Sequence, residues 1–206
     1  MCFSAPVSFA TSAALAVVGV KTIKHATPRR RFIAAIPLMF SAQQAVEGVQ
    51  WLLDRPSMCS QIFGYGFLFF AFFVWPVYIP LSVWYAEHIR WRRRVLLVLV
   101  GIGTALAAYF IAVAVHEPLR VTSSLARIQY GIDIPYFAFS ATIYVLATTS
   151  SFLLSSHRPL RWFGVTSFVA AVISWWFFSH AFTSVWCFFA AALSVGLYWW
   201  TRKRAS

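Results

Sequence analysis

Seven uninterrupted hydrophobic segments, each about as long as a bilayer is thick, determine what this chain can fold into. The segments cover residues 5–24, 32–53, 61–86, 94–116, 134–155, 160–179 and 183–201. A helix needs about 20 residues to cross the roughly 30 Å hydrocarbon core of a membrane. Continuous rather than alternating hydrophobicity favours helices over a transmembrane barrel. We therefore predict an all-α fold, a bundle of seven transmembrane helices that forms a single domain over residues 1–206.

The composition agrees with a membrane protein. The chain is 61% hydrophobic and only 11% charged, with a mean hydropathy of +0.73. A soluble domain of 206 residues could not bury that much apolar surface. The net charge of +12 would favour nucleic acid on a soluble protein, but no basic groove interrupts the apolar spans. We therefore predict no nucleic-acid partner.

The loops between the segments divide the basic residues unequally. Only Arg55, Arg120 and Arg127 lie in the second, fourth and sixth loops. By the positive-inside rule, the N-terminus lies outside and the C-terminus in the cytoplasm. The basic loops also suit anionic lipid head groups at the cytoplasmic face. The other 14 of the 17 lysines and arginines lie on the cytoplasmic side: Lys21, Lys24, Arg29, Arg30, Arg31, Arg90, Arg92, Arg93, Arg94, Arg158, Arg161, Arg202, Lys203 and Arg204.

Two features depart from plain apolar helices. The third segment contains Pro76 and Pro80, and because each proline removes a backbone donor, we expect this helix to kink. The longest loop, residues 117–133, lies on the outer side. Within it, residues 125–130 (Leu-Ala-Arg-Ile-Gln-Tyr) fit a short interfacial helix over the mouth of the bundle.

Glu47 is the one ionisable residue well inside a predicted span. An unpaired charge in lipid costs several kcal/mol, so Glu47 is the first candidate for a functional group. Helical spacing places it on one face with Gln43 and Trp51, about 10 Å below the outer boundary. We therefore predict a polar pocket that opens outward, with these ligand-binding residues: Glu47, Gln43, Gln44, Trp51 and Trp186.

Cysteine and histidine side chains at a similar depth leave three interpretations open. In the first, a zinc or copper ion is held by Cys2, Glu47, His180 and Cys187, although no spacing such as CxxC or HExxH occurs. In the second, Cys2 forms a disulfide with Cys59 or Cys187. In the third, Glu47 only holds helices together, through amide, serine or tryptophan groups or the chain's amino terminus.

The ionisable residues at the cytoplasmic ends of the spans receive a plainer interpretation. Glu87 and the histidines at positions 25, 88 and 157 lie among arginines. We interpret them as ordinary interfacial residues.

Four short motifs carry a resemblance to a known family. They are residues 1–5 (Met-Cys-Phe-Ser-Ala), 43–48 (Gln-Gln-Ala-Val-Glu-Gly), 75–80 (Trp-Pro-Val-Tyr-Ile-Pro) and 184–189 (Ser-Val-Trp-Cys-Phe-Phe). Together they resemble, over nearly the full length, an uncharacterised family of small bacterial membrane proteins that begin Met-Cys-Phe-Ser. The resemblance implies a seven-helix protein of the bacterial inner membrane and no established activity. The family's motif positions match Cys2, Gln44, Glu47, Trp51, Pro76, Trp186 and Cys187, but not His116 or His180.

The function predicted from these residues is a binding module. It takes a small ligand, a lipid or a metal at the Glu47 pocket, or serves as an accessory subunit beside a membrane-protein partner. The alternative is a membrane-embedded metal-dependent hydrolase similar to the ceramidases, for which His116, His180 and Asp133 supply part of a ligand set. A microbial rhodopsin is excluded, because every lysine lies at a span end. A transporter would require further broken helices.

Overall fold

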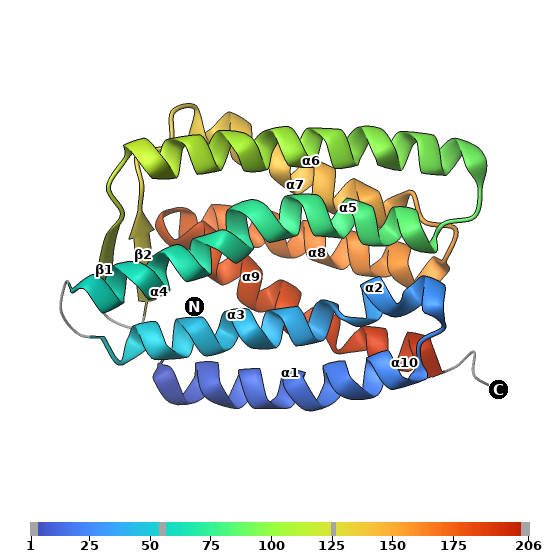
Figure 1. Ribbon diagram of the computed structural model, residues 1–206, viewed down its shortest axis with the longest axis horizontal. Helices are drawn as coiled ribbons and strands as arrows, with labels where there is room; N and C mark the ends of the chain where they lie inside the picture. Colours follow the sequence, from blue (N-terminus) through green and yellow to red (C-terminus); the bar gives the residue numbers. More distant parts are fainter. Residues whose placement is uncertain (1–3, 54–56, 125–126, 203–206) are drawn as a thin grey trace.

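The helices run back and forth along one common axis (Figure 1). The structure, a computed structural model, describes residues 4–53, 57–124 and 127–202. Its elements in chain order are α1 (Ala5–His25), η1 (Pro28–Arg30), α2 (Arg31–Ala34), α3 (Ile36–Trp51), α4 (Met58–Leu68), η2 (Phe69–Val74), α5 (Trp75–Ala86), α6 (Arg90–His116), β1 (Arg120–Ser124), β2 (Arg127–Gly131), α7 (Phe137–Leu153), α8 (Arg158–Phe178), η3 (Ser179–Ala181), α9 (Phe182–Ser194) and α10 (Gly196–Arg202).

These elements form seven passes, as the hydrophobic segments predicted. Within the described residues, six of the passes are long and apolar enough to cross a membrane. Three of these six are composite: Pro28–Trp51, Met58–Ala86 and Phe182–Thr201. The seventh pass, α7, is apolar but has only 17 residues.

The two ends of the bundle differ in charge. At one end, here called the hairpin end, strands β1 and β2 lie beside α4 (Figure 1). The other end is called the basic end, because α1 finishes there and α6 and α8 begin there with arginines. The lysines and arginines of the basic end, within the described side chains, are Lys21, Lys24, Arg29, Arg30, Arg31, Arg90, Arg92, Arg93, Arg94, Arg158 and Arg161.

Small residues let α1 and α3 pack closely. Ser12 Oγ donates to the Ser41 carbonyl at 2.9 Å, and Ser41 Oγ returns a bond to the Ser12 carbonyl at 2.7 Å. At Gly19, an added Cβ would lie 2.7 Å from the backbone nitrogen of Leu38. Such small-residue contacts with hydrogen bonds between helices are typical of membrane bundles. They fix α3, and with it Glu47, against the first helix.

The irregular part of the third pass lies just before its prolines. Residues Phe69–Val74 form the π-helical segment η2, and α5 begins directly after it with Pro76 in its first turn. Pro76 has no N–H, so the carbonyl four residues earlier loses its helical partner, and a π-helical turn accommodates such a break. Pro80 lies inside α5. At the start of α5, the Pro76 carbonyl lies against the backbone of Gly103 on α6.

The loop between α6 and α7 contains a β-hairpin, so the prediction of an interfacial helix is wrong for residues 127–130, and residues 125–126 lie outside the described residues. Strands β1 and β2 pair antiparallel, with Val121 opposite Tyr130 and Ser123 opposite Ile128. β-Branched residues on both strands, together with Tyr130 on β2, favour this pairing over a helix. The hairpin packs on α4, where Phe67 stacks on Tyr130 with ring centroids 4.4 Å apart. It therefore covers the mouth of the bundle, as the predicted helix would have done.

Candidate functional site

Glu47 lies in the last turns of α3 and is fully buried, with 0% of its surface exposed. Ser184 Oγ, from the first turn of α9, donates to Glu47 Oε1 at 2.6 Å. Gln44 Nε2 donates to Glu47 Oε2 at 3.3 Å. A buried carboxylate requires such hydrogen-bond donors, because water no longer solvates it. The acid therefore connects α3 to α9, two helices far apart in the sequence.

Gln43 extends this polar group to a third helix. Trp75 Nε1, on α5, donates to Gln43 Oε1 at 2.8 Å. The Gln43 amide also lies against the Cys187 thiol, and its nitrogen has no oxygen partner among the described residues. Glu47 is a further electrostatic neighbour of this thiol. We call the five buried polar side chains Gln43, Gln44, Glu47, Ser184 and Cys187 the Glu47 cluster.

A cavity of about 220 Å³ lies beside this cluster at the hairpin end. Its walls come from strand β2, the π-helical segment, the start of α7 and the start of α9. We call it the hairpin cavity. Ser184 lines it while also donating to Glu47. The carboxylate is therefore one hydroxyl group away from the cavity.

Two smaller cavities continue from the hairpin cavity into the bundle. The first, of about 20 Å³, shares Phe182 and Thr183 with the hairpin cavity. The second, of about 40 Å³, shares Trp186 and Cys187 with the first. A site needs about 10–15 Å³ to hold a water molecule, so each has room for about one to three. The three cavities are separate but follow one another from the hairpin end to the Cys187 thiol.

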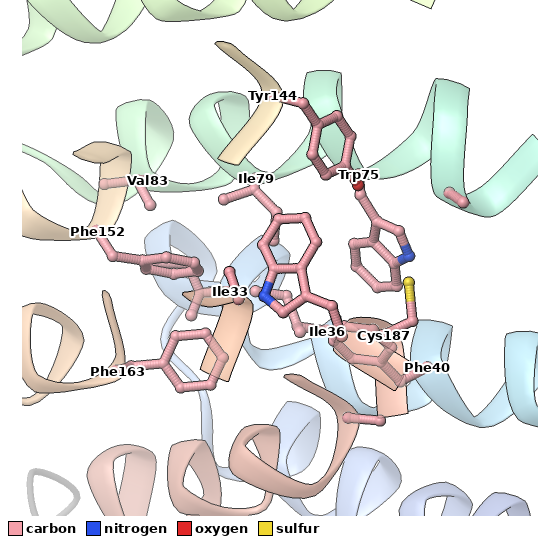
Figure 2. Close-up of a cluster of buried hydrophobic side chains, with 14 of the residues drawn as sticks. Ile33, Ile36, Phe40, Trp75, Ile79, Val83, Tyr144, Phe152, Phe163 and Cys187 are labelled. Atoms are coloured by element: carbon pink, nitrogen blue, oxygen red, sulfur yellow. The ribbon is translucent and has the colours of Figure 1, made fainter. Parts of the chain in front are cut away.

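The inner end of this row of cavities is aromatic. Figure 2 shows the Cys187 thiol beside Trp75 and Phe40, with Tyr144 above and the Phe152 and Phe163 rings farther along the core. Phe40 stacks on Trp75 with ring centroids 4.0 Å apart. Cys187, which is 4% exposed, is thus surrounded by aromatic rings on the side that faces away from Gln43 and Glu47.

Comparisons with known proteins supply a family but no activity. A family model covers residues 1–206 and is described as a family of unknown function (DUF6629). The chain belongs to this family. No curated protein and no solved structure matches it. Membership in DUF6629 agrees with the prediction of an uncharacterised family.

Two predicted ligand-binding residues of this family member, Trp51 and Trp186, can be described by their other contacts. Trp51, at the end of α3, is half-buried, and its indole nitrogen has no hydrogen-bond partner among the described residues. Trp186 packs between Tyr144 and Phe182, and its indole nitrogen donates to the Ser167 carbonyl at 3.2 Å. Trp186 lines the two inner cavities rather than the hairpin cavity.

The predicted metal ligands are only partly visible. Cys2 and the side chain of His180 lie outside the described residues, whereas Glu47 and Cys187 are neighbours. Within the described part of the chain, no three histidine, cysteine or acidic side chains come together as a metal site. A zinc or copper ion at Cys2, Glu47, His180 and Cys187 therefore stays a prediction.

Cys59 and Cys187 were the two predicted disulfide partners of Cys2. Cys59 is an exposed free thiol and Cys187 a buried one, so neither is bonded as the two disulfide alternatives required. The amino terminus, predicted as a possible partner of Glu47, is outside the described residues.

Two residues predicted for the alternative hydrolase, His116 and Asp133, are exposed near the hairpin end. Glu47, in contrast, is fully buried.

At the basic end the structure shows an acidic site that sequence reasoning missed. Glu87 is 1% exposed and accepts two bonds from Ser156, from its backbone N–H at 2.6 Å and its hydroxyl at 2.7 Å. It also accepts the backbone N–H groups of His88 at 2.9 Å and Ile89 at 3.0 Å. Burial would raise the pKa of Glu87, but these four hydrogen bonds outweigh it and lower the pKa from 4.5 to about 2.

Glu87 therefore ties the α5–α6 turn to the loop before α8. A signal was present in the sequence, because Glu87 is an acid at an end otherwise rich in arginines. An acidic residue in such a place calls for specific partners, whereas the interfacial interpretation assigned it none.

Proposed function

We propose that this protein is a multi-pass membrane protein that binds a small organic cation in the hairpin cavity. The apolar passes and the separation of basic residues to one end support an inner-membrane location, with the hairpin end outside. The family resemblance favours a bacterial source. The hairpin cavity would then receive its ligand from the external side.

One observation carries the ligand class: the hydroxyl proton of Ser184 is directed to Glu47. A serine hydroxyl has one donor and two acceptor lone pairs. Because its proton is committed to the carboxylate, Ser184 offers only acceptor capacity to the cavity. A ligand that meets Ser184 therefore has to bring an N–H or O–H donor.

The rest of the cavity favours a positive charge on that donor. Phe72, Tyr130, Phe137 and Phe182 contribute aromatic walls, and aromatic faces attract organic ammonium groups. Glu47 behind Ser184, in its ionised form, adds a negative potential that water screens little in this buried cluster. A small primary amine combines the required donor with the favoured charge.

Purified protein in detergent tests this proposal with methylammonium to butylammonium chloride as probes and sodium chloride as the ionic-strength control. The proposal expects the amines, and not sodium, to raise the thermal midpoint. Ser184→Ala should weaken the amine effect about tenfold, as expected for loss of a hydrogen bond to a charged group. Ser194→Ala is the matched control, because Ser194 is also buried on α9 but donates to the Ala191 carbonyl of its own helix.

Two results would contradict the proposal. Equal responses of the two serine variants would remove Ser184 from the site. A response to butanol that matches the response to butylammonium would remove the cation.

The metal-dependent hydrolase is the alternative proposal, supported by the Cys187 thiol beside the Glu47 carboxylate. It requires a metal ion at the Glu47 cluster, which would act as a Lewis acid. Elemental analysis of the purified protein distinguishes the two proposals: stoichiometric zinc or copper that is lost in Cys187→Ser would favour the hydrolase.

A further inference from the structure

The basic end contains a second, larger cavity, separate from the hairpin cavity. It measures about 500 Å³ and lies between the loop before α8, the first residues of α8 and helix α10. This size is within the range of about 300–1,000 Å³ that is typical of ligand pockets. Its walls include Ser156, His157, Arg158, Trp199 and Trp200. We call it the basic cavity.

The Trp200 ring of the cavity wall lies beside an arginine and a histidine. The Arg30 guanidinium lies 4.9 Å from the Trp200 ring centroid, and the His157 ring centroid lies 5.4 Å from it. Trp200 is buried, and Trp199 beside it is 55% exposed. The half-buried Arg30 thus stacks on Trp200, a wall residue of the basic cavity, and adds positive potential behind that wall.

The start of α8 adds further positive potential. The first turn of α8, all of which the structure describes, contains no acidic residue, and its N-cap residue His157 makes no side-chain capping bond. The partial positive charge of this helix end is therefore not offset by a carboxylate. The Arg158 side chain, exposed and lining the cavity, supplies a full charge at the same place.

Glu87, a buried acid of the described residues, does not cancel this charge. It meets the cavity wall through Ser156. Its two carboxylate oxygens already accept hydrogen bonds from Ser156, His88 and Ile89. A negatively charged ligand in the cavity would therefore meet Arg158, whereas the Glu87 carboxylate is hydrogen-bonded to Ser156 and to the α5–α6 turn.

We propose that the basic cavity binds a phosphate group. An arginine guanidinium matches phosphate oxygens in geometry, and the partial positive charge at the start of α8 favours an anion there. The phosphate can come from a phospholipid head group or from a free phosphate compound. Trp199, exposed at the end of a pass where tryptophans occupy the lipid head-group region, is positioned to contact a lipid glycerol or acyl chain.

Native mass spectrometry of the purified full-length protein tests the proposal with phosphatidylglycerol, phosphatidylcholine and inorganic phosphate as probes. We compare wild type with Arg158→Gln, which removes an exposed charge at the cavity. The matched control is Arg94→Gln, which removes an exposed arginine from α6 at the same end. Thermal midpoints verify that each variant is folded.

The expected result is a first phosphatidylglycerol bound about tenfold more weakly to Arg158→Gln, as for the loss of one charge-assisted contact. Arg94→Gln should change the affinity by no more than about twofold, because it removes only a screened surface charge. Displacement of the lipid by inorganic phosphate would identify the phosphate group alone as the ligand. Retention of the lipid would identify the phospholipid as the source.

Equal weakening by the two arginine substitutions would overturn the proposal, because it would show binding to the general surface potential. So would equal binding of phosphatidylcholine and phosphatidylglycerol that neither substitution changes. Neither result bears on the amine experiment at the hairpin cavity, so the two proposals fail separately.

Discussion

A single methyl group added at Gly103 should separate α6 from α5. A Cβ atom at this position would lie 1.8 Å from the Pro76 carbonyl oxygen and 2.7 Å from its carbon. Real Cβ contacts begin near 3.0 Å, so the two backbones would have to move apart by about 1.2 Å. Because the obstacle is backbone, no side-chain rotation can relieve the clash.

The magnitude follows from comparison with Gly101, two residues away on α6. Among the described atoms, none lies within 4 Å of a Cβ placed at Gly101. Replacing glycine by alanine inside a helix gains up to about 1 kcal/mol in helix propensity at both positions. The difference between the two variants therefore isolates the clash, which we place at about 3 kcal/mol from the upper range for overpacked sites. For about 200 residues this corresponds to roughly 6–12 °C in thermal midpoint.

Size-exclusion chromatography of heated, detergent-solubilised protein measures this difference. We expect Gly101→Ala to melt at or slightly above the wild type and Gly103→Ala to melt roughly 6–12 °C below Gly101→Ala. Midpoints within about 2 °C of each other would refute the close approach of α5 and α6.

Three further predictions concern the buried acids and the thiols. Glu87 has a pKa of about 2, below its ordinary 4.5, so its ionised form stabilises the folded state above pH 4.5. This contribution should disappear as the pH falls from about 4.5 to about 2. Glu87→Gln should flatten the pH dependence of the midpoint there, and parallel curves would contradict it. Glu47→Gln should lower the midpoint by more than His25→Gln, because Glu47 is buried and hydrogen-bonded whereas His25 is exposed; equal midpoints would contradict this expectation. Maleimide should label Cys59 in folded protein and Cys187 only after unfolding, because Cys59 is exposed and Cys187 is buried. Mass spectrometry of the labelled peptides measures this, and labelling of Cys187 in folded protein would contradict it.

Hydrophobicity was sufficient to predict the passes, but it located their ends less well. The fourth segment was predicted from residue 94, whereas α6 begins at Arg90. Hydropathy registers only the apolar part of a helix. Arginine is a good helix former, so the backbone continues into the basic loop without an apolar signal.

The loop between α6 and α7 and the partners of Glu47 show where sequence reasoning stopped. The hairpin depends on cross-strand pairs such as Val121 with Tyr130, and a single strand's pattern does not reveal its partner. The burial of Glu47 was predictable, because a charged side chain inside an apolar span has to face the bundle interior. Its bond to Ser184 was not, because sequence periodicity does not show that α3 and α9 are neighbours.

The brevity of α7 has a consequence for the lipid around the protein. Seventeen residues at a rise of about 1.5 Å each extend for about 25 Å, some 5 Å less than a typical hydrocarbon core. Such hydrophobic mismatch is relieved when the adjoining bilayer thins, at a fraction of a kcal/mol for each ångström. The annulus beside α7 should therefore be compressed, which would draw the protein toward thinner membrane regions and short-chain lipids.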